Sequence, residues 1–417
     1  MTTLCKFCYN NDKLLFKYRG SVKVPPLEMV DDIVTVMNCG DKSKSLNVAV
    51  NTFENHKKLK LSAQNCANIH IGNKASRIKC PEKKIYCDIM KESEKEKYLG
   101  DFLTTKANSK DTIAAKKARG YGILGEIGAI LRDIPFGNWR TQIGLLLRKA
   151  WFLNSCLANS EVWVGISDSD KKDLEIIDHK ILRVILGSQA KVPVEMLYLE
   201  TSELPISHII SVRRLSYWHH ILRRNKNELV HQIYKAMKEN PLKGDWIHAL
   251  SDDLLKIGMN LDDDENVVKL TKSSFKKIIK KNIRIISHHE LESLKTSHDK
   301  VRFIVHQNLE KPQQYLTGIE FSNAQKSILF NLRSKCEKSF KDNFHKMHQN
   351  TTCMCKKDLD SQEHALVCDI VLKHLSEQDK LTLEEVQYSD IFSDLHSQHR
   401  ITQLYQSIIK IKKRLLS

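Results

Sequence analysis

The sequence predicts an α+β fold in which helices predominate. Short runs rich in β-branched residues, which are typical of strands, are confined to the N-terminal quarter of the chain. From Asp111 onward, apolar residues recur at the three- and four-residue spacing of amphipathic helices. Gly and Pro number only 15 and 8 among 417 residues, so long irregular linkers are not expected. The chain should therefore begin with a small strand-containing part and continue as a long helical part.

Residues 27–37 form the clearest predicted β-hairpin. Two apolar runs with high β-branched content flank Asp31 and Asp32, which places this acidic pair at the turn. The next expected element is an amphipathic helix whose apolar face carries Leu46, Ala49, Val50 and Phe53. Residues 69–72 and 98–100, each ending in Gly, are further strand candidates.

The helical part divides into several predicted helices. Their marker positions are Ile113, Lys117, Leu124, Ile127 and Leu131; Ile143, Leu146, Leu147, Ala150 and Leu157; Leu174, Ile177, Ile181 and Ile185; and the stretches 213–224 and 229–238. Gly187 should end the third of these helices. Pro241, Lys243 and Gly244 then interrupt the pattern, and we place a boundary there. The predicted domains are residues 1–110, 111–240 and 241–417.

The charge balance favours a polyanionic partner. Lys and Arg number 67 against 50 Asp and Glu, which gives a net charge of +17 and a pI near 9.2. An excess of this size is typical of proteins that bind nucleic acid. The alternative is a basic surface that is simply solvated.

Cysteine usage and hydropathy bear on the compartment. The 11 Cys are odd in number and irregularly spaced, which does not suggest a framework of disulfides. No run reaches the roughly 18 apolar residues that a membrane-spanning helix needs, and no signal-peptide pattern begins the chain. We therefore expect reduced thiols, no membrane partner, and a location in the cytoplasm or nucleus.

The most basic predicted helix follows the break near residue 241. Its apolar stripe should dock on a core while its lysines face solvent. The apolar positions are Phe275, Ile278, Ile279, Ile283 and Ile286, and the basic ones are Lys269, Lys272, Lys276, Lys277, Lys280, Lys281 and Arg284. Lys272, Lys276 and Lys280 are the candidate nucleic-acid contacts on this helix.

Asp31 and Asp32 are candidate metal ligands. Two carboxylates on a tight hairpin can hold divalent ions roughly 4 Å apart, as two-metal polymerases do. Mg²⁺ suits such a site because it prefers hard oxygen ligands and shares its coordination shell with substrate phosphates. The alternative is an ordinary surface turn, in which Asp is common.

Cys353, Cys355, His364 and Cys368 form a second candidate metal site. The His-x₃-Cys half has ligand spacing suited to Zn²⁺, whereas Cys-x-Cys is tighter than the usual Cys-x₂₋₄-Cys. Unliganded thiols are the alternative. Lys356 and Lys357 beside this loop would suit phosphate contacts.

His219 and His220 stand next to Trp218 in a predicted helix. We interpret them as core or surface histidines and not as a pair of metal ligands, because adjacent helical positions do not share a face. Trp151 and Trp163 are interpreted as core residues and not as platforms for base stacking.

The order of several motifs resembles the C-terminal half of the endonuclease–reverse transcriptases of non-LTR (LINE-like) retrotransposons. Pro-Pro-Leu-Glu-Met-Val-Asp-Asp-Ile at residues 25–33 resembles the Asp-Asp hairpin of that family, and Glu-Lys-Tyr-Leu-Gly-Asp at 96–101 its primer-grip hairpin. Asn-Ser-Glu-Val-Trp at 159–163 is similar to part of the thumb. Gln-Glu-His-Ala-Leu-Val-Cys at 362–368 resembles the C-terminal zinc knuckle. The similarity runs in order over most of residues 13–417.

This resemblance implies an RNA-directed DNA polymerase that works by two-metal nucleotidyl transfer on an RNA and DNA template-primer. Residues 1–110 would be a partial antiparallel palm, 111–240 a helical thumb, and 241–417 a basic helical region with a zinc knuckle near 353–368. Asp31 and Asp32 would be catalytic and would bind Mg²⁺. Tyr98, Leu99 and Gly100 would position the primer, and the knuckle would hold Zn²⁺.

The chain also departs from the family pattern. A third carboxylate on an earlier palm strand, the fingers and the endonuclease do not occur in it, and Asn65 stands where the family carries Lys. We therefore expect a truncated reverse transcriptase that has no polymerase activity as this chain, because two-metal catalysis depends on its ligands acting together. The alternative is a non-enzymatic nucleic-acid-binding protein derived from such an element.

Overall fold

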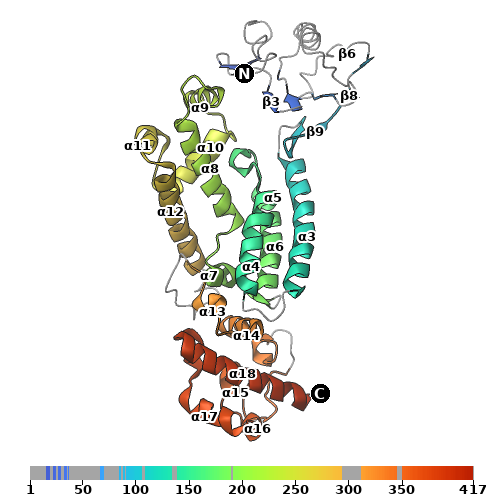
Figure 1. Cartoon of the computed structure of the whole chain (residues 1–417), viewed down its shortest axis with the longest axis vertical. Coiled ribbons are helices and arrows are strands. Elements are labelled where there is room, and N and C mark those ends of the chain that lie inside the picture. The colour runs from blue at the N-terminus through green and yellow to red at the C-terminus, as the bar shows by residue number, and fades with distance from the viewer. Residues whose placement is uncertain are drawn as a thin grey trace. The chain divides into compact units, whose positions relative to one another are not determined.

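The computed structural model describes residues 16–18, 22–24, 27–29, 32–34, 36, 66–69, 84–85, 88–89, 91–105, 109–133, 139–188, 191–293, 311–344 and 350–416. Over these ranges the chain is mostly helical, and its named strands all precede residue 105 (Figure 1). The prediction of a mainly helical α+β chain is therefore confirmed. No helix in the described ranges has both the length and the apolar character needed to cross a membrane.

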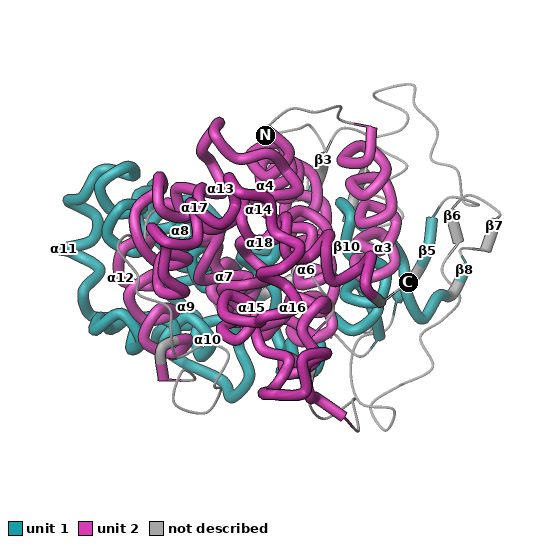
Figure 2. The backbone as a smooth tube through the Cα atoms, turned by 90° about the horizontal axis from the view of Figure 1, so that it is seen from below, with its two compact units in different colours: residues 1–115, 158–170, 210–279 teal, residues 116–157, 171–209, 280–417 magenta. Residues whose placement is uncertain are grey.

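The chain forms two compact units, each made from separate stretches of sequence (Figure 2). Unit 1 comprises Met1–Ala115, Ala158–Asp170 and Ile210–Ile279, and unit 2 comprises Lys116–Leu157, Lys171–Ile209 and Lys280–Ser417. Unit 1 thus draws on all three segments predicted from the sequence. The three predicted segments are each continuous in sequence, whereas the compact units are not. The predicted domain boundaries therefore stay predictions.

Short strands of unit 1 pair two by two. They are β1 (Phe16–Tyr18) with β2 (Val22–Val24), β3 (Leu27–Met29) with β4 (Asp32–Val34), β5 (Ala67–Asn68) with β8 (Lys91–Glu92), β6 (Lys84–Ile85) with β7 (Asp88–Ile89), and β9 (Lys95–Tyr98) with β10 (Asp101–Thr104). Only β5 and β8 among these pairs run parallel. Val22 and Val24 are buried, and their strand contacts helix α9 (Leu229–Glu239).

The predicted hairpin is confirmed as an antiparallel strand pair, but the placement of Asp32 at its turn was wrong, since Asp32 is the first residue of β4. Met29 of β3 lies opposite Asp32 of β4 in an antiparallel pair. Asp31 lies outside the described residues, and for Asp32 the structure describes the backbone alone. The predicted helix over residues 46–53 also lies outside the described residues.

The β9–β10 hairpin turns at Leu99 and Gly100. Both have positive φ, 46° and 88°, which is the geometry of a tight two-residue hairpin turn. The amide of Asn159 donates to the Leu99 carbonyl at 3.1 Å and to the Asp101 carboxylate at 3.0 Å. These bonds hold the turn while the Leu99 side chain stays 43% exposed.

Helices of unit 1 enclose an aromatic core. Besides α9, they include η5 (Ser160–Val162), most of α8 (Ile206–Leu222), α10 (Trp246–Lys256), η6 (Leu261–Asp263), α11 (Asp264–Lys269) and the first turns of α12 (Lys272–Ser293). Trp218 is fully buried, and its indole N–H donates to the Tyr234 hydroxyl at 3.0 Å. Phe275 of α12 packs edge-on against Trp218 at 6.0 Å between ring centroids. The apolar stripe predicted for α12 therefore docks as expected at Phe275, Ile279 and Ile283, but Ile278 is 40% exposed.

Unit 2 has helices as its named elements within the described residues, and loops connect them. It contains most of α3 (Lys110–Asp133) and α6 (Asp168–Leu186), together with α4 (Arg140–Leu147), the π-helical η4 (Arg148–Leu153), α5 (Asn154–Cys156), α7 (Val194–Thr201), α13 (Gln314–Thr317), α14 (Asn323–Arg333), η8 (Lys341–Phe344), α15 (Gln362–Ala365), α16 (Asp369–Lys373), α17 (Glu377–Glu385), η9 (Tyr388–Phe392) and α18 (Leu395–Leu416). The apolar face predicted for α6 is buried, and Gly187 ends that helix with φ 61° as predicted. A Cβ on Gly144 would lie 2.7 Å from Ile185, so α4 can approach α6 only with glycine there.

A buried ion cluster lies where η4 begins. The guanidinium of Arg148 donates to both carboxylate oxygens of Asp178 at 2.6 and 2.7 Å, and to Glu203 at 2.7 Å. Arg148 and Asp178 are fully buried. The hydroxyl of Tyr198 donates to Asp178 at 3.2 Å. The bidentate pair of Arg148 and Asp178 thus joins η4 to α6. Charge-assisted bidentate pairs of this kind are among the strongest hydrogen bonds in proteins.

A second buried network anchors the C-terminal helices of unit 2. Arg333 at the end of α14 donates to Glu200 of α7 at 2.8 Å and to the Ile391 carbonyl at 2.8 Å. Tyr315 donates to the other Glu200 oxygen at 2.9 Å. Glu200, Arg333 and Tyr315 are at most 2% exposed. This network fixes the scaffold on which the Cys/His loop is built.

Candidate metal centre

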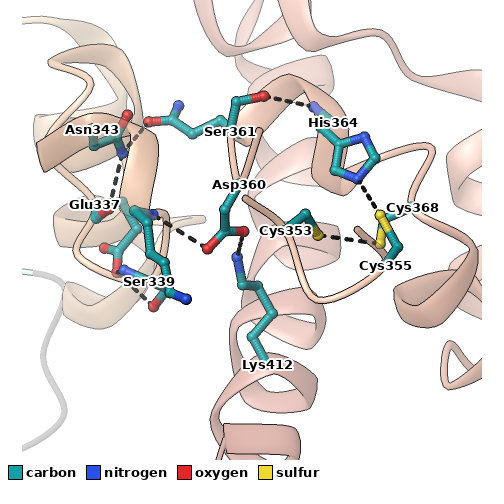
Figure 3. Close-up of polar contacts among 12 residues, drawn as sticks. Glu337, Ser339, Asn343, Cys353, Cys355, Asp360, Ser361, His364, Cys368 and Lys412 are labelled. Carbon is teal, nitrogen blue, oxygen red and sulfur yellow. Dashed lines mark hydrogen bonds and ion pairs between the residues drawn. The ribbon is translucent and has the colours of Figure 1, made fainter. Parts of the chain in front are cut away.

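The four residues predicted as a metal site come together in unit 2. Cys353 and Cys355 lie in a loop, His364 lies in α15, and Cys368 immediately precedes α16. One sulfur or nitrogen atom from each of them lies within 4.8 Å of the others. Figure 3 shows the three sulfurs and the imidazole converging on one point. A metal-binding geometry, left open by the sequence, is therefore present.

The backbone of the loop explains how so tight a spacing as Cys-x-Cys can work. Thr352 and Leu359 form an antiparallel bridge, and the Cys353 N–H donates to the Asp358 carbonyl at 2.8 Å. Within this closed loop the Lys356 N–H donates to the Cys353 carbonyl at 2.9 Å, with Lys356 at φ 62°. The turn brings both thiols to one side although a single residue separates them.

The second half of the site depends on helix termini. Ser361 caps α15, because its hydroxyl accepts a hydrogen bond from the His364 N–H at 3.0 Å. The Val367 N–H donates to the His364 carbonyl at 3.0 Å, which turns the chain at the end of α15. Cys368 follows in extended conformation as the N-cap residue of α16. The His-x₃-Cys spacing thus spans one turn between two short helices.

The distances fit a tetrahedral zinc ion. Cys353 Sγ lies 3.6 Å from Cys368 Sγ, and Cys355 Sγ lies 3.1 Å from His364 Nε2. Zinc–sulfur bonds of about 2.3 Å at tetrahedral angles place neighbouring sulfurs about 3.8 Å apart. Three thiolates and one imidazole are a typical set for a closed structural site. These four residues could therefore hold a zinc ion.

The local environment shifts the pKa values of the two loop thiols in opposite directions. Burial raises the pKa of Cys353, which is 5% exposed. The backbone N–H of Lys357 and the imidazole of His364 lower the pKa of Cys355. A bound metal would be needed to hold Cys353 as a thiolate at neutral pH, because a buried thiol otherwise keeps its proton.

Asp358 is a residue that the sequence did not single out. Its carboxylate lies 3.7 Å from His364 Nδ1, on the side of the ring away from Cys355. A carboxylate at this position can orient a metal-binding histidine. No spacing rule could have found Asp358, because its place beside the ring follows from the loop closing on α15.

The loop is fastened to the rest of unit 2 by the residues that follow it. Asp360 accepts an ion-pair hydrogen bond from Lys412 of α18, and both side chains are at most 7% exposed (Figure 3). The Gln362 carbonyl accepts from Tyr405 of α18 at 2.9 Å. The Gln362 side chain bonds Asn343 at 2.9 Å. The candidate metal centre is therefore continuous with the packing of α18.

The other predicted site residues lie on separate elements. Tyr98 ends β9, and Leu99 and Gly100 form the turn of the next hairpin. Lys272, Lys276 and Lys280 are exposed along α12. Lys356 and Lys357 are exposed beside the cluster, and Lys357 pairs with Asp369.

The Mg²⁺ prediction at Asp31 and Asp32 stays a prediction, since it concerns side chains that the structure does not describe. The histidine pair consists of one core and one surface residue, as interpreted from the sequence: His219 is 2% exposed, and His220 is exposed. Comparison of the chain with protein-family models, with curated proteins and with solved structures found no match.

Proposed function

We propose that this chain is a nucleic-acid-binding part of a reverse transcriptase of the non-LTR retrotransposon kind, with a zinc knuckle at Cys353, Cys355, His364 and Cys368. The observation that carries the proposal is the convergence of these four ligand atoms within 4.8 Å. The family resemblance also implies a zinc knuckle in this C-terminal stretch of the chain. Zinc knuckles are a recurrent RNA-binding module. The cluster therefore supports both the metal and the class of partner.

The charge of the chain supports the same partner. The net charge is +17, and exposed lysines stand beside the cluster and along α12. Lys276 and Lys277 have no ion pair with any described residue. Cations that lack protein partners are available to replace the counterions of phosphates.

The proposed relationship to a polymerase rests on the two hairpins. The β3–β4 pair would present Asp31 and Asp32, and the β9–β10 turn would present Leu99 to a primer strand. In that relationship residues 1–110 belong to a palm and the helices that follow belong to a thumb. We propose that the chain itself does not polymerise, because the family's third carboxylate has no counterpart in these residues.

Binding to nucleic acid should depend strongly on salt. Raising the salt from 50 to 200 mM is expected to weaken binding about tenfold to several-hundredfold, the range that roughly two to five phosphate contacts give. Filter binding of labelled RNA and DNA across a salt series measures this. The triple replacement of Lys272, Lys276 and Lys280 with alanine should reduce the salt slope. Lys235→Ala is the matched control, because Lys235 is already paired with Glu239 at 3.7 Å. A flat response to salt would contradict phosphate-driven binding.

Primer extension should be absent. We expect the purified chain to add no nucleotide to a primed RNA template with Mg²⁺ or Mn²⁺, because the two-metal site lacks a ligand. Incorporation of labelled deoxynucleotide measures this, and Asp31→Ala is the comparison. Robust extension by the wild-type chain that disappears in Asp31→Ala would show that the polymerase site is complete.

A further inference from the structure

The C-terminal end of α8 carries a column of flat side chains that the zinc knuckle does not use. The rings of Tyr217 and His220 stack with centroids 6.1 Å apart and planes at 23°. The guanidinium of Arg224 lies at the edge of the His220 ring, since its Nε donates to His220 Nε2 at 3.1 Å. Tyr217 in turn packs edge-on against Trp246 at 6.1 Å. His220 and Arg224 are exposed, so the column ends at solvent.

The neighbouring histidine brings a second helix to this column. His219 is buried, stacks on Phe275 of α12 at 4.7 Å, and contacts the Leu270 carbonyl at 3.0 Å. These contacts dock the start of α12 against the end of α8. Lys272 consequently lies close enough to lower the pKa of both His219 and His220, although burial is the larger cause for each.

The cations around the column are largely uncompensated. We define the α8–α12 surface as His220, Arg223, Arg224, Lys226 and Lys272, all of which are exposed. Among the described residues, no carboxylate lies within 4.0 Å of the charged groups of Arg223, Lys226 or Lys272. Two acidic residues are near the column: Glu228 lies 3.6 Å from Arg224, and Glu161 lies near Tyr217. Such an excess of like charge is relieved when a polyanion binds.

One exposed imidazole stacked on a half-buried tyrosine ring, among cations that lack a carboxylate partner, matches the chemistry of an unpaired strand. Single-stranded nucleic acid offers phosphates to lysine and arginine, and it offers bases that stack on aromatic, histidine and arginine planes. A duplex hides its base faces, and an acidic peptide has carboxylates without flat bases. The column therefore favours the single strand over both alternatives.

We propose that the α8–α12 surface binds single-stranded RNA or DNA, with a base stacked on the exposed face of His220 and phosphates on Arg223, Lys226 and Lys272. This deepens the proposed function and rests on it, because it gives the partner a second binding surface besides the knuckle. The surface lies wholly in unit 1, whereas the knuckle lies in unit 2.

The test compares two probes on the full-length chain. Fluorescence anisotropy is measured with a labelled oligothymidylate and with a duplex DNA. His220→Ala should weaken binding of the single strand about fivefold to a hundredfold, as removal of one stacking platform does, and should change duplex binding little. His220→Phe should restore single-strand binding, since it keeps a flat ring. Arg223→Ala with Lys226→Ala should weaken both probes and lower the salt slope.

Lys235→Ala is the matched control, because Lys235 is an exposed, ion-paired lysine of the same unit, and it should bind like the wild type. Wild-type binding that is unchanged in His220→Ala would overturn the stacking proposal and leave the proposed function standing. Binding of neither probe by the wild type would overturn the proposed function and this inference with it. Polyglutamate that displaces the oligothymidylate at equal concentration would overturn the inference in favour of an acidic protein partner.

Discussion

Cys368→Ser is expected to abolish stoichiometric zinc binding and to unfold the part of unit 2 that contains α15 and α16. These helices have only 4 and 5 residues, far below the roughly 12 residues at which an isolated helix becomes even marginally stable. Their order must therefore come from packing and from the metal. Structural zinc contributes about 10–16 kcal/mol of apparent binding free energy in small zinc-binding peptides, which exceeds the stability of most domains.

Two measurements check this result. Elemental analysis of the purified wild type should find one zinc per chain, and Cys368→Ser should retain little. Thermal unfolding of the wild type with a chelator should resemble that of the variant without it. Cys336→Ala is the matched control, because Cys336 is a buried cysteine of the same unit that is not part of the cluster. A wild-type protein that is folded but holds no zinc would refute the assignment of the knuckle.

Arg148→Met should lower the free energy of unfolding by about 3–5 kcal/mol, which is the usual cost of removing one partner of a buried ion pair. The effect is large because Asp178 and Arg148 are both fully buried. Methionine fills much of the space but donates no hydrogen bond, so Asp178 would keep only the Tyr198 hydroxyl among the partners described above. The uncompensated carboxylate is the main cost.

Urea denaturation followed by circular dichroism measures the change. The paired replacement of Arg148 with Met and Asp178 with Leu should recover much of the loss, because a buried ion pair can be exchanged for apolar packing at little cost. Lys117→Met is the control: Lys117 pairs with Asp173 at 3.0 Å, but both side chains are over a third exposed. That change should cost at most about 1 kcal/mol. Equal losses in Arg148→Met and Lys117→Met would show that burial of the pair does not matter.

Much of the helical framework could be predicted from periodicity. The apolar positions of α6 were identified together with the Gly187 that ends the helix, since both depend on spacing within one helix. The docked stripe of α12 was found in the same way, except that Ile278 lies at the edge of the stripe and is exposed. The ligand residues of the candidate metal centre were also predictable, because zinc sites require soft ligands close together in sequence.

Other features could not be found from local patterns. Arg148 meets Asp178 and Glu203 only after three separate segments have packed, so no spacing along the chain indicates the ion cluster. The sequence alone does not distinguish the environments of His219 and His220. Only the docking of α12 makes His219 a core residue and leaves His220 exposed. Asp358 likewise reaches His364 only because its loop closes on α15.

The sequence by itself determined the mainly helical class, the positions of α6 and α12, the basic character, and the identity of the four candidate zinc ligands. Only the tertiary structure decided that those ligands converge, which charged groups are buried as pairs, and which cations remain open beside His220. The physical reason is that helix periodicity and ligand spacing act over a few neighbouring residues. Burial and pairing depend instead on segments far apart in the chain being brought together.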